Sequence, residues 1–214
     1  MATKHTKGVI DLTFKDIENS DGLISSMREA VESQISSPKK KPLSDEMETL
    51  QMNTMEGTTP PSPTKEKEPE MVKAIRLSNN LLEDMDHIVN PIVDTVDASQ
   101  ILWLDLSFNQ FSNITESAAA AFPNIKTIYM HANNITKISQ LKKLKFFPNL
   151  KSLSLYGNPV EEHKHYRNYT LNMCPNLTQF DSSPVTGSER KRAEIWSQTF
   201  RNVLNREDEE EYYR

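Results

Sequence analysis

Apolar residues return along this chain at one fixed spacing. Four segments place aliphatic or aromatic residues at their first, fourth, sixth and eleventh positions and an asparagine at the ninth. These segments are residues 72–82, 101–111, 125–135 and 150–160, and their asparagines are Asn80, Asn109, Asn133 and Asn158. Successive asparagines lie 29, 24 and 25 residues apart. Four matches at a nearly constant period indicate a structural repeat.

The spacing within each segment predicts a short strand followed by a turn. The fourth and sixth residues, such as Leu104 and Leu106, would both face inward, because side chains alternate across a strand. The asparagine amide would satisfy backbone groups of the turn. One segment cannot bury its own apolar side, so the segments must stack. The pattern therefore predicts an α/β leucine-rich-repeat solenoid, with short parallel strands on the concave face and helical or irregular segments on the convex face.

Between the strands, apolar residues at helical spacing predict convex elements. Residues 84–100 fit a helix, which Pro91 should bend or split. After the last repeat, residues 166–190 are predicted to cap the exposed apolar end of the stack. Within this cap, Leu177 and Phe180 continue the ladder as a fifth, degenerate strand.

Composition divides the chain into three parts. Residues 1–70 are predicted to form an extended, proline-rich amino-terminal arm with helical spacing over 22–35, because six of the twelve prolines fall within 38–69. A short apolar cluster from Val9 to Ile17 would either pack on the repeats or dock on a partner. Residues 71–186 form the repeat domain with its cap, and residues 187–214 form a charged helix with an acidic tail.

Strand alternation also predicts which residues line the concave face. Six side chains with aromatic or charged groups would stand there as partner contacts: Arg76, Trp103, Asp105, Tyr129, His131 and Tyr156. Aromatic residues among small polar ones are typical anchors of protein interfaces. Arg76 and Asp105 hold equivalent positions on adjacent strands and are expected to pair. The alternative is that Trp103 and Tyr129 only pack on each other.

An apolar stripe follows the carboxy-terminal helix. Trp196, Phe200 and Leu204 recur at every fourth residue and so share one helical face. Two interpretations remain open, namely docking of this stripe on the cap and contact of Trp196, Phe200 and Leu204 with a partner.

Composition and missing motifs narrow the function. The net charge of −5 argues against nonspecific nucleic-acid binding. The single cysteine, Cys174, is expected to be a small buried residue, and His163 and His165 are not expected to bind metal, since residues two apart on a helix do not share a face. No phosphate-binding loop, long apolar run or catalytic set occurs. We therefore expect no enzyme activity, cofactor, small-molecule substrate or membrane contact.

Several segments together resemble one family. They are residues 102–109 and 152–162, Tyr166-Arg167-x-Tyr169, Phe180-Asp181 with Val185-Thr186, and Arg192 to Trp196. On these segments the chain resembles the leucine-rich repeat-containing protein 51 family over residues 70–200. The long proline-rich extension departs from the shorter family form.

The resemblance implies a non-enzymatic adaptor of the ciliary or flagellar axoneme in the cytoplasm, bound to tubulin or to doublet-associated proteins. One alternative is a cytosolic regulatory subunit that targets a phosphatase or another enzyme, and another is an assembly factor of an RNA complex. Phosphorylation of Ser37, Thr59 and Ser62, each followed by proline, is left open by the sequence.

Overall fold

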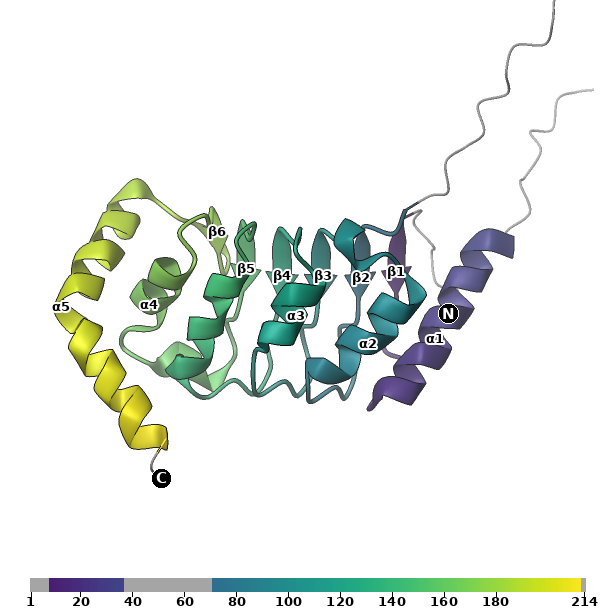
Figure 1. Cartoon of the computed structure of the whole chain (residues 1–214), viewed down its shortest axis with the longest axis horizontal. Coiled ribbons are helices and arrows are strands. Elements are labelled where there is room, and N and C mark those ends of the chain that lie inside the picture. Colours follow the sequence, from purple (N-terminus) through teal and green to yellow (C-terminus); the bar gives the residue numbers. More distant parts are fainter. Residues whose placement is uncertain (1–7, 37–70, 213–214) are drawn as a thin grey trace, which may run out of the picture.

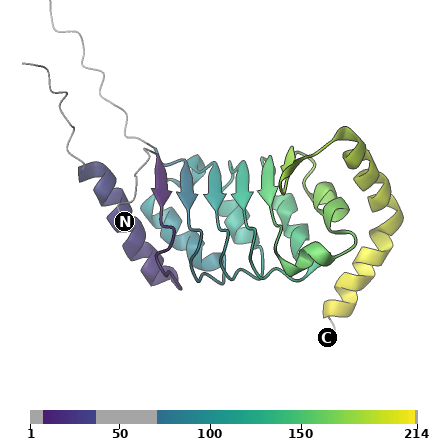
Figure 2. The same ribbon diagram turned by 180° about the vertical axis from the view of Figure 1, so that it is seen from behind.

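The computed structural model describes residues 8–36 and 71–212. Within these ranges the chain forms a curved stack whose single sheet follows the chain order β1-β2-β3-β4-β5-β6-β7. Strands β1 to β6 are parallel, and β7 runs antiparallel to β6. The sheet lines one side of the stack, and helical segments line the other (Figures 1 and 2). The predicted α/β leucine-rich-repeat architecture is confirmed.

The strands are two or three residues long, as the repeat template requires. They are β1 (Val9–Asp11), β2 (Ala74–Arg76), β3 (Trp103–Asp105), β4 (Thr127–Tyr129), β5 (Ser152–Ser154), β6 (Gln179–Phe180) and β7 (Ser183–Pro184). The α-helices are α1 (Ser20–Ser36), α2 (Asp86–Thr95), α3 (Glu116–Ala121), α4 (Tyr166–Met173) and α5 (Gly187–Tyr212). The 3-10 segments are η1 (Ala98–Gln100), η2 (Ile138–Phe146) and η3 (Pro159–Glu162).

The stack begins one repeat earlier than the sequence pattern indicated. Strand β1 pairs with β2 in direct register, with Ile10 opposite Ile75. Ile10, Leu12 and Ile17 are buried in the common core, and so is the inner face of α1. The predicted helix over 22–35 is present as α1, and of the two alternatives for the apolar cluster at 9–17, the cluster packs on the repeats. Residues 8–36 form a first repeat, so the prediction of an extended arm is wrong for this part. Residues 1–7 and 37–70, with Ser37, Thr59 and Ser62, lie outside the described residues.

Helix α1 also explains how α2 accommodates a proline. The predicted break at Pro91 does not occur, because α2 is continuous across it. A proline inside a helix leaves the carbonyl four residues earlier without its usual N–H partner. Here that carbonyl belongs to His87, and it accepts a hydrogen bond from the Ser20 hydroxyl at 3.0 Å. The first helix thus supplies the donor that Pro91 lacks.

The repeat asparagines form a buried ladder that ties each repeat to the one before it. The Asn133 amide nitrogen donates to the carbonyls of Met130, in its own turn, and Leu106, in the preceding turn, at 3.0 and 2.9 Å. Its amide oxygen accepts the backbone N–H of Phe111 at 3.0 Å. Asn80, Asn109 and Asn158 bond in the same manner to their own and the preceding turn. The asparagines therefore fix the spacing between repeats.

The carboxy-terminal end is closed by α4 and α5, which pack against each other (Figure 1). Helix α5 begins with a capping box, in which Thr186 N donates to Glu189 Oε2 at 2.8 Å and Glu189 N donates to Thr186 Oγ1 at 3.3 Å. These bonds to Thr186 and an ion pair with Arg167 at 2.8 Å lower the pKa of Glu189 to about 2. The predicted cap is thus present and consists of α4, β6, β7 and α5, with β6 as the predicted degenerate strand.

The single cysteine lies within this cap. Cys174 is buried, and its burial raises the pKa of the thiol to about 12. A thiol that stays protonated is a poor nucleophile, so Cys174 fills space in the core.

Candidate protein-binding face

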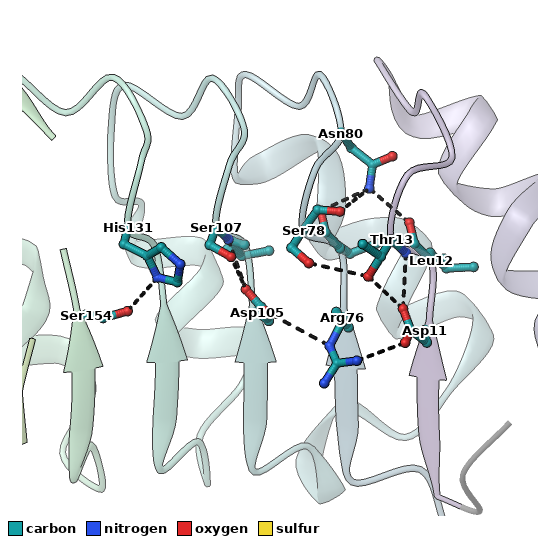
Figure 3. A network of polar contacts seen from close by, with 12 residues as sticks. Asp11, Leu12, Thr13, Arg76, Ser78, Asn80, Asp105, Ser107, His131 and Ser154 are labelled. Atoms are coloured by element: carbon teal, nitrogen blue, oxygen red, sulfur yellow. Dashed lines mark hydrogen bonds and ion pairs between the residues drawn. The ribbon is translucent and has the colours of Figure 1, made fainter. Parts of the chain in front are cut away.

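The concave face, formed by the outward residues of β1 to β5, carries a chain of polar contacts at its amino-terminal side (Figure 3). Arg76 forms an ion pair with Asp11 at 2.9 Å and lies 3.8 Å from Asp105. The expected pairing of Arg76 with Asp105 occurs, but Asp11 is the closer partner. Burial alone would raise the pKa of Asp11, yet hydrogen bonds from Thr13 and the Arg76 guanidinium hold it below its usual range. This network fixes the Arg76 side chain over the sheet.

From Arg76 an aromatic run crosses the next three strands. We define the aromatic run as Trp103, Tyr129, His131 and Tyr156. The Arg76 guanidinium lies 5.3 Å from the Trp103 ring centroid, a cation–π contact. Trp103 and Tyr129 meet edge to face at 5.6 Å, and His131 stacks on Tyr156 at 4.6 Å. The four predicted side chains therefore stand together, as strand alternation required.

All members of the aromatic run keep surface open to a partner. Trp103, Tyr129 and His131 are half-buried, and Tyr156 is 40% exposed. Trp103 and Tyr129 do pack on each other, and the ring contacts continue through His131 to Tyr156. Pre-packed rings lose little conformational entropy on binding, which suits interface anchors.

His131 is held neutral at the centre of the aromatic run. Burial lowers its pKa below the ordinary 6.5, and the carboxylates of Asp105 and Asp181 only partly oppose this. One ring nitrogen, Nδ1, lies 2.9 Å from the Ser154 hydroxyl, which orients the ring (Figure 3). The face thus offers aromatic surface around a neutral imidazole at physiological pH.

Two exposed phenylalanines near this face were missed by strand alternation, because they lie in the turns. Phe108 is 51% exposed and its ring meets His131 edge to face at 5.2 Å. Phe14, in the corresponding turn of the first repeat, is 73% exposed. Both have left-handed backbones, with φ of 54° and 57°. Phe108 holds the template position just before the asparagine, where the other repeats have the smaller residues Asn79, Ala132 and Gly157. A large apolar residue at this turn position is the signal that could have identified it.

The left-handed backbone at Phe108 leads to a prediction. A bulky residue there costs about 1 kcal/mol or more, whereas glycine adopts this conformation freely. Phe108→Gly should therefore be more stable than Phe108→Ala by about 1 kcal/mol, since both lose the ring but only glycine relieves the strain. Urea unfolding of both variants measures this difference. Equal stability of the two, or a more stable alanine variant, would contradict the strain.

Some predicted contacts have other roles in the structure. Asp105 is buried and accepts hydrogen bonds from the backbone and hydroxyl of Ser107, so it holds its own turn and Arg76 and offers little surface to a partner.

Trp196 is only 7% exposed, because it packs on Tyr169 and Phe200 in the cap and donates to His165 Nδ1 at 3.0 Å. The prediction of a partner contact is wrong for Trp196. Phe200 is half-buried beside it, and the Leu204 side chain lies outside the described ones.

Among the described residues, no group of three or more histidine, cysteine or acidic side chains could hold a metal ion. His163 and His165 are neighbours, but His165 contacts the Trp196 and Phe200 rings. No helix in the same parts of the chain is long and apolar enough to cross a membrane.

Comparison with known proteins agrees with this architecture. The leucine-rich-repeat family matches the chain over residues 70–207. The chain belongs to this family. It is 38% identical over 129 residues to leucine-rich repeat-containing protein 51 of Bos taurus, an alignment covering 59% of this chain and 66% of that protein. The human protein of the same name is 35% identical over 129 residues, with the same coverage. The resemblance seen in the sequence is therefore confirmed.

A second relative comes from a ribonucleoprotein. The U2 small nuclear ribonucleoprotein A′ of Neurospora crassa is 34% identical over 94 residues, which cover 44% of this chain and 37% of that protein. Among solved structures, the Drosophila melanogaster SNF/U2A′ complex matches with a TM-score of 0.52 and 27% identity, covering 62% of this chain and 73% of that one. Membership of the leucine-rich-repeat family supports a role in protein–protein interaction.

Proposed function

We propose that this chain is a non-enzymatic structural adaptor of the ciliary or flagellar axoneme, which binds doublet microtubules or their associated proteins through its concave face. The observation that carries the binding role is the aromatic run, in which four contacting rings from three consecutive repeats remain open to a partner. The axonemal setting is what the resemblance to the leucine-rich repeat-containing protein 51 family implies.

The mechanism of binding follows from the rigidity of this face. The strands are fixed by the asparagine ladder, and the rings are fixed by one another and by Arg76. Interfaces take most of their binding energy from a few desolvated aromatic and arginine anchors. A protein partner would cover the aromatic run and exclude water from it, while the polar network around Asp11 and Asp105 forms the rim.

A pull-down with a concave-face variant tests the binding role. In this variant Trp103, Tyr129, His131 and Tyr156 are all alanine, and partners recovered from flagellated cells should fall by about tenfold or more, as expected when hot-spot residues are truncated. The control changes Thr127 and Ser152, small outward residues of the same face, to alanine. Retention of every partner by the concave-face variant, with its fold intact by circular dichroism, would reject this site.

Localisation tests the axonemal setting separately. A tagged copy expressed in a flagellated cell should remain on the axoneme after detergent and moderate salt. Diffuse staining with release into the cytosol, together with stoichiometric co-purification of a phosphatase or another enzyme, would favour a regulatory subunit instead.

A second candidate is the assembly of a ribonucleoprotein through a protein partner. It is favoured by the similarity to U2 small nuclear ribonucleoprotein A′ and by the fold shared with the SNF/U2A′ complex. Nuclear staining of the tagged copy and recovery of RNA-binding proteins in the pull-down would support it over the axonemal adaptor.

A further inference from the structure

The stack is divided electrostatically into two halves. Residues 77–116 contain seven acidic residues and no lysine or arginine, whereas residues 117–160 contain six lysines and no acidic residue. The first stretch runs from the turn after β2 through α2 and β3 to the start of α3, and the second contains β4 and β5. Because the repeats stack in chain order, the acidic residues lie nearer the amino-terminal end of the solenoid and the lysines lie nearer its carboxy-terminal end.

Three lysines gather at the amino-terminal edge of β4 and β5. Lys126 and Lys151 directly precede these strands and are adjacent across the sheet, since the backbone N–H of Lys151 donates to the carbonyl of Lys126 at 2.8 Å. Lys145 lies near the end of η2, and its ammonium is 4.7 Å from the Phe146 ring centroid. All three lysines are exposed. We define Lys126, Lys145 and Lys151 as the cationic edge.

The loops that carry the cationic edge are held in place. The Asn149 side chain, just before Lys151, donates to the carbonyl of Pro123, just before Lys126, at 3.0 Å. In the next repeat, the Asn176 side chain donates in the same way to the carbonyl of Pro148 at 3.0 Å. These bonds fix the spacing of the backbones from which the lysines extend. An acidic segment at this edge would therefore meet exposed lysines that extend from a fixed backbone.

We propose that the cationic edge binds an acidic polypeptide segment of a partner, at a site separate from the concave face. Like charges spaced along a fixed edge attract a segment of opposite charge and orient its approach. Phe146, 38% exposed beside Lys145, offers an apolar contact next to the ammonium groups. The site thus suits a glutamate- or aspartate-rich strand that also carries an apolar residue.

The chemistry favours a polypeptide over a nucleic acid. No arginine occurs between Arg76 and Arg167, so the planar fork that binds phosphate bidentately is missing from this region. A nucleic acid long enough to extend from the cationic edge toward β3 would also approach the acidic residues of 77–116, and their carboxylates would repel its phosphates. A short acidic segment is confined to the lysine-rich repeats and avoids this repulsion.

The chain's own acidic tail does not reach this edge in the same molecule. Helix α5 starts beside the amino-terminal edge of the sheet and runs away from it toward the opposite edge (Figure 1). At about 1.5 Å per residue, its 26 residues carry the tail roughly 39 Å from that start. This tail is therefore not the occupant in the same molecule, and the occupant that we propose is a segment of another polypeptide.

Binding of a fluorescein-labelled octaglutamate peptide to the full chain tests this proposal. Saturable binding should occur at low salt and weaken as salt is added, because the screening length is only about 10 Å at 0.1 M. Changing Lys126, Lys145 and Lys151 to glutamate should weaken binding by about tenfold or more, since three attractions become repulsions. The matching glutamine variant should give an intermediate affinity and guards against misfolding of the charge-reversed chain.

A matched control changes three other exposed lysines, Lys15, Lys73 and Lys164, to glutamate, with the same change in net charge. This control and the concave-face variant should both bind octaglutamate like the wild type. The peptide assay therefore tests the cationic edge alone, and its result does not depend on whether the concave face binds a partner. No saturable binding, or equal loss in the control, would overturn the proposal. Tighter binding of octauridylate RNA, or self-association that octaglutamate competes away, would overturn it in favour of nucleic acid or of a second copy's tail.

Discussion

Replacing Asn133 with alanine should lower the free energy of unfolding by about 2 to 4 kcal/mol, since one buried N–H left without a partner costs about 1 to 3 kcal/mol and each further hydrogen bond lost costs about 0.5 to 1.5 kcal/mol. Three carbonyls, those of Leu106, Met130 and His131, accept hydrogen bonds from the Asn133 amide, and the backbone N–H of Phe111 donates to it. In the alanine variant each carbonyl keeps one other donor, namely Asn109, Asn158 or the backbone N–H of Phe108, but the Phe111 N–H is left without its partner. The loss is a large share of the stability of a single domain, which is about 5 to 15 kcal/mol.

The position of Asn133 in the stack shapes the expected unfolding curve. It joins the β3 and β4 repeats, and repeat proteins are held together by such neighbour contacts. Urea unfolding followed by circular dichroism should therefore shift to lower urea and become less cooperative. Asn134→Ala is the control, because Asn134 is the next residue but is exposed. Similar stability of the two variants would show that the buried ladder contributes little.

Trp196→Ala should destabilise the cap by about 3 kcal/mol or more, the usual cost of truncating a buried tryptophan. Its ring stacks near Phe200 and meets Tyr169, and its indole N–H donates to His165. Without it, α5 retains its capping box and the ion pair of Arg167 with Glu189 but loses its apolar anchor on α4. We expect α5 to separate from the cap and expose the end of the stack.

Limited proteolysis and urea unfolding measure this effect. Cleavage within α5 should become faster in Trp196→Ala than in the wild type, and the unfolding midpoint should fall. Ile195→Ala is the matched control, since Ile195 precedes Trp196 but is 64% exposed, and surface substitutions usually change stability by less than about 0.5 kcal/mol. If Trp196→Ala loses a partner without any loss of stability, Trp196 acts as a partner contact after all.

The regular part of the fold followed from the sequence because its signals are local. The period of the asparagines identified the repeats, and strand alternation placed Trp103, Tyr129, His131 and Tyr156 side by side. The first repeat was missed for two reasons. Residues 37–70 separate it from the others, and Lys15 stands where the template has asparagine. Asn80 accepts the backbone N–H of Lys15 in addition to its ladder bond from Ile17, a contact between residues far apart in sequence.

The sequence by itself determined the repeat, the inward and outward residues and the aromatic concave face, because spacing of two residues along a strand fixes side-chain direction. Only the tertiary structure decided between alternatives that share one local pattern. The stripe of Trp196, Phe200 and Leu204 could face a partner or the cap, and packing on α4 buried Trp196. Contacts with Ser107 and Arg76 likewise buried Asp105 on the concave face, and stacking in chain order placed Lys126 and Lys151 just before adjacent strands. These outcomes depend on which surfaces meet, and a sequence pattern does not contain that information.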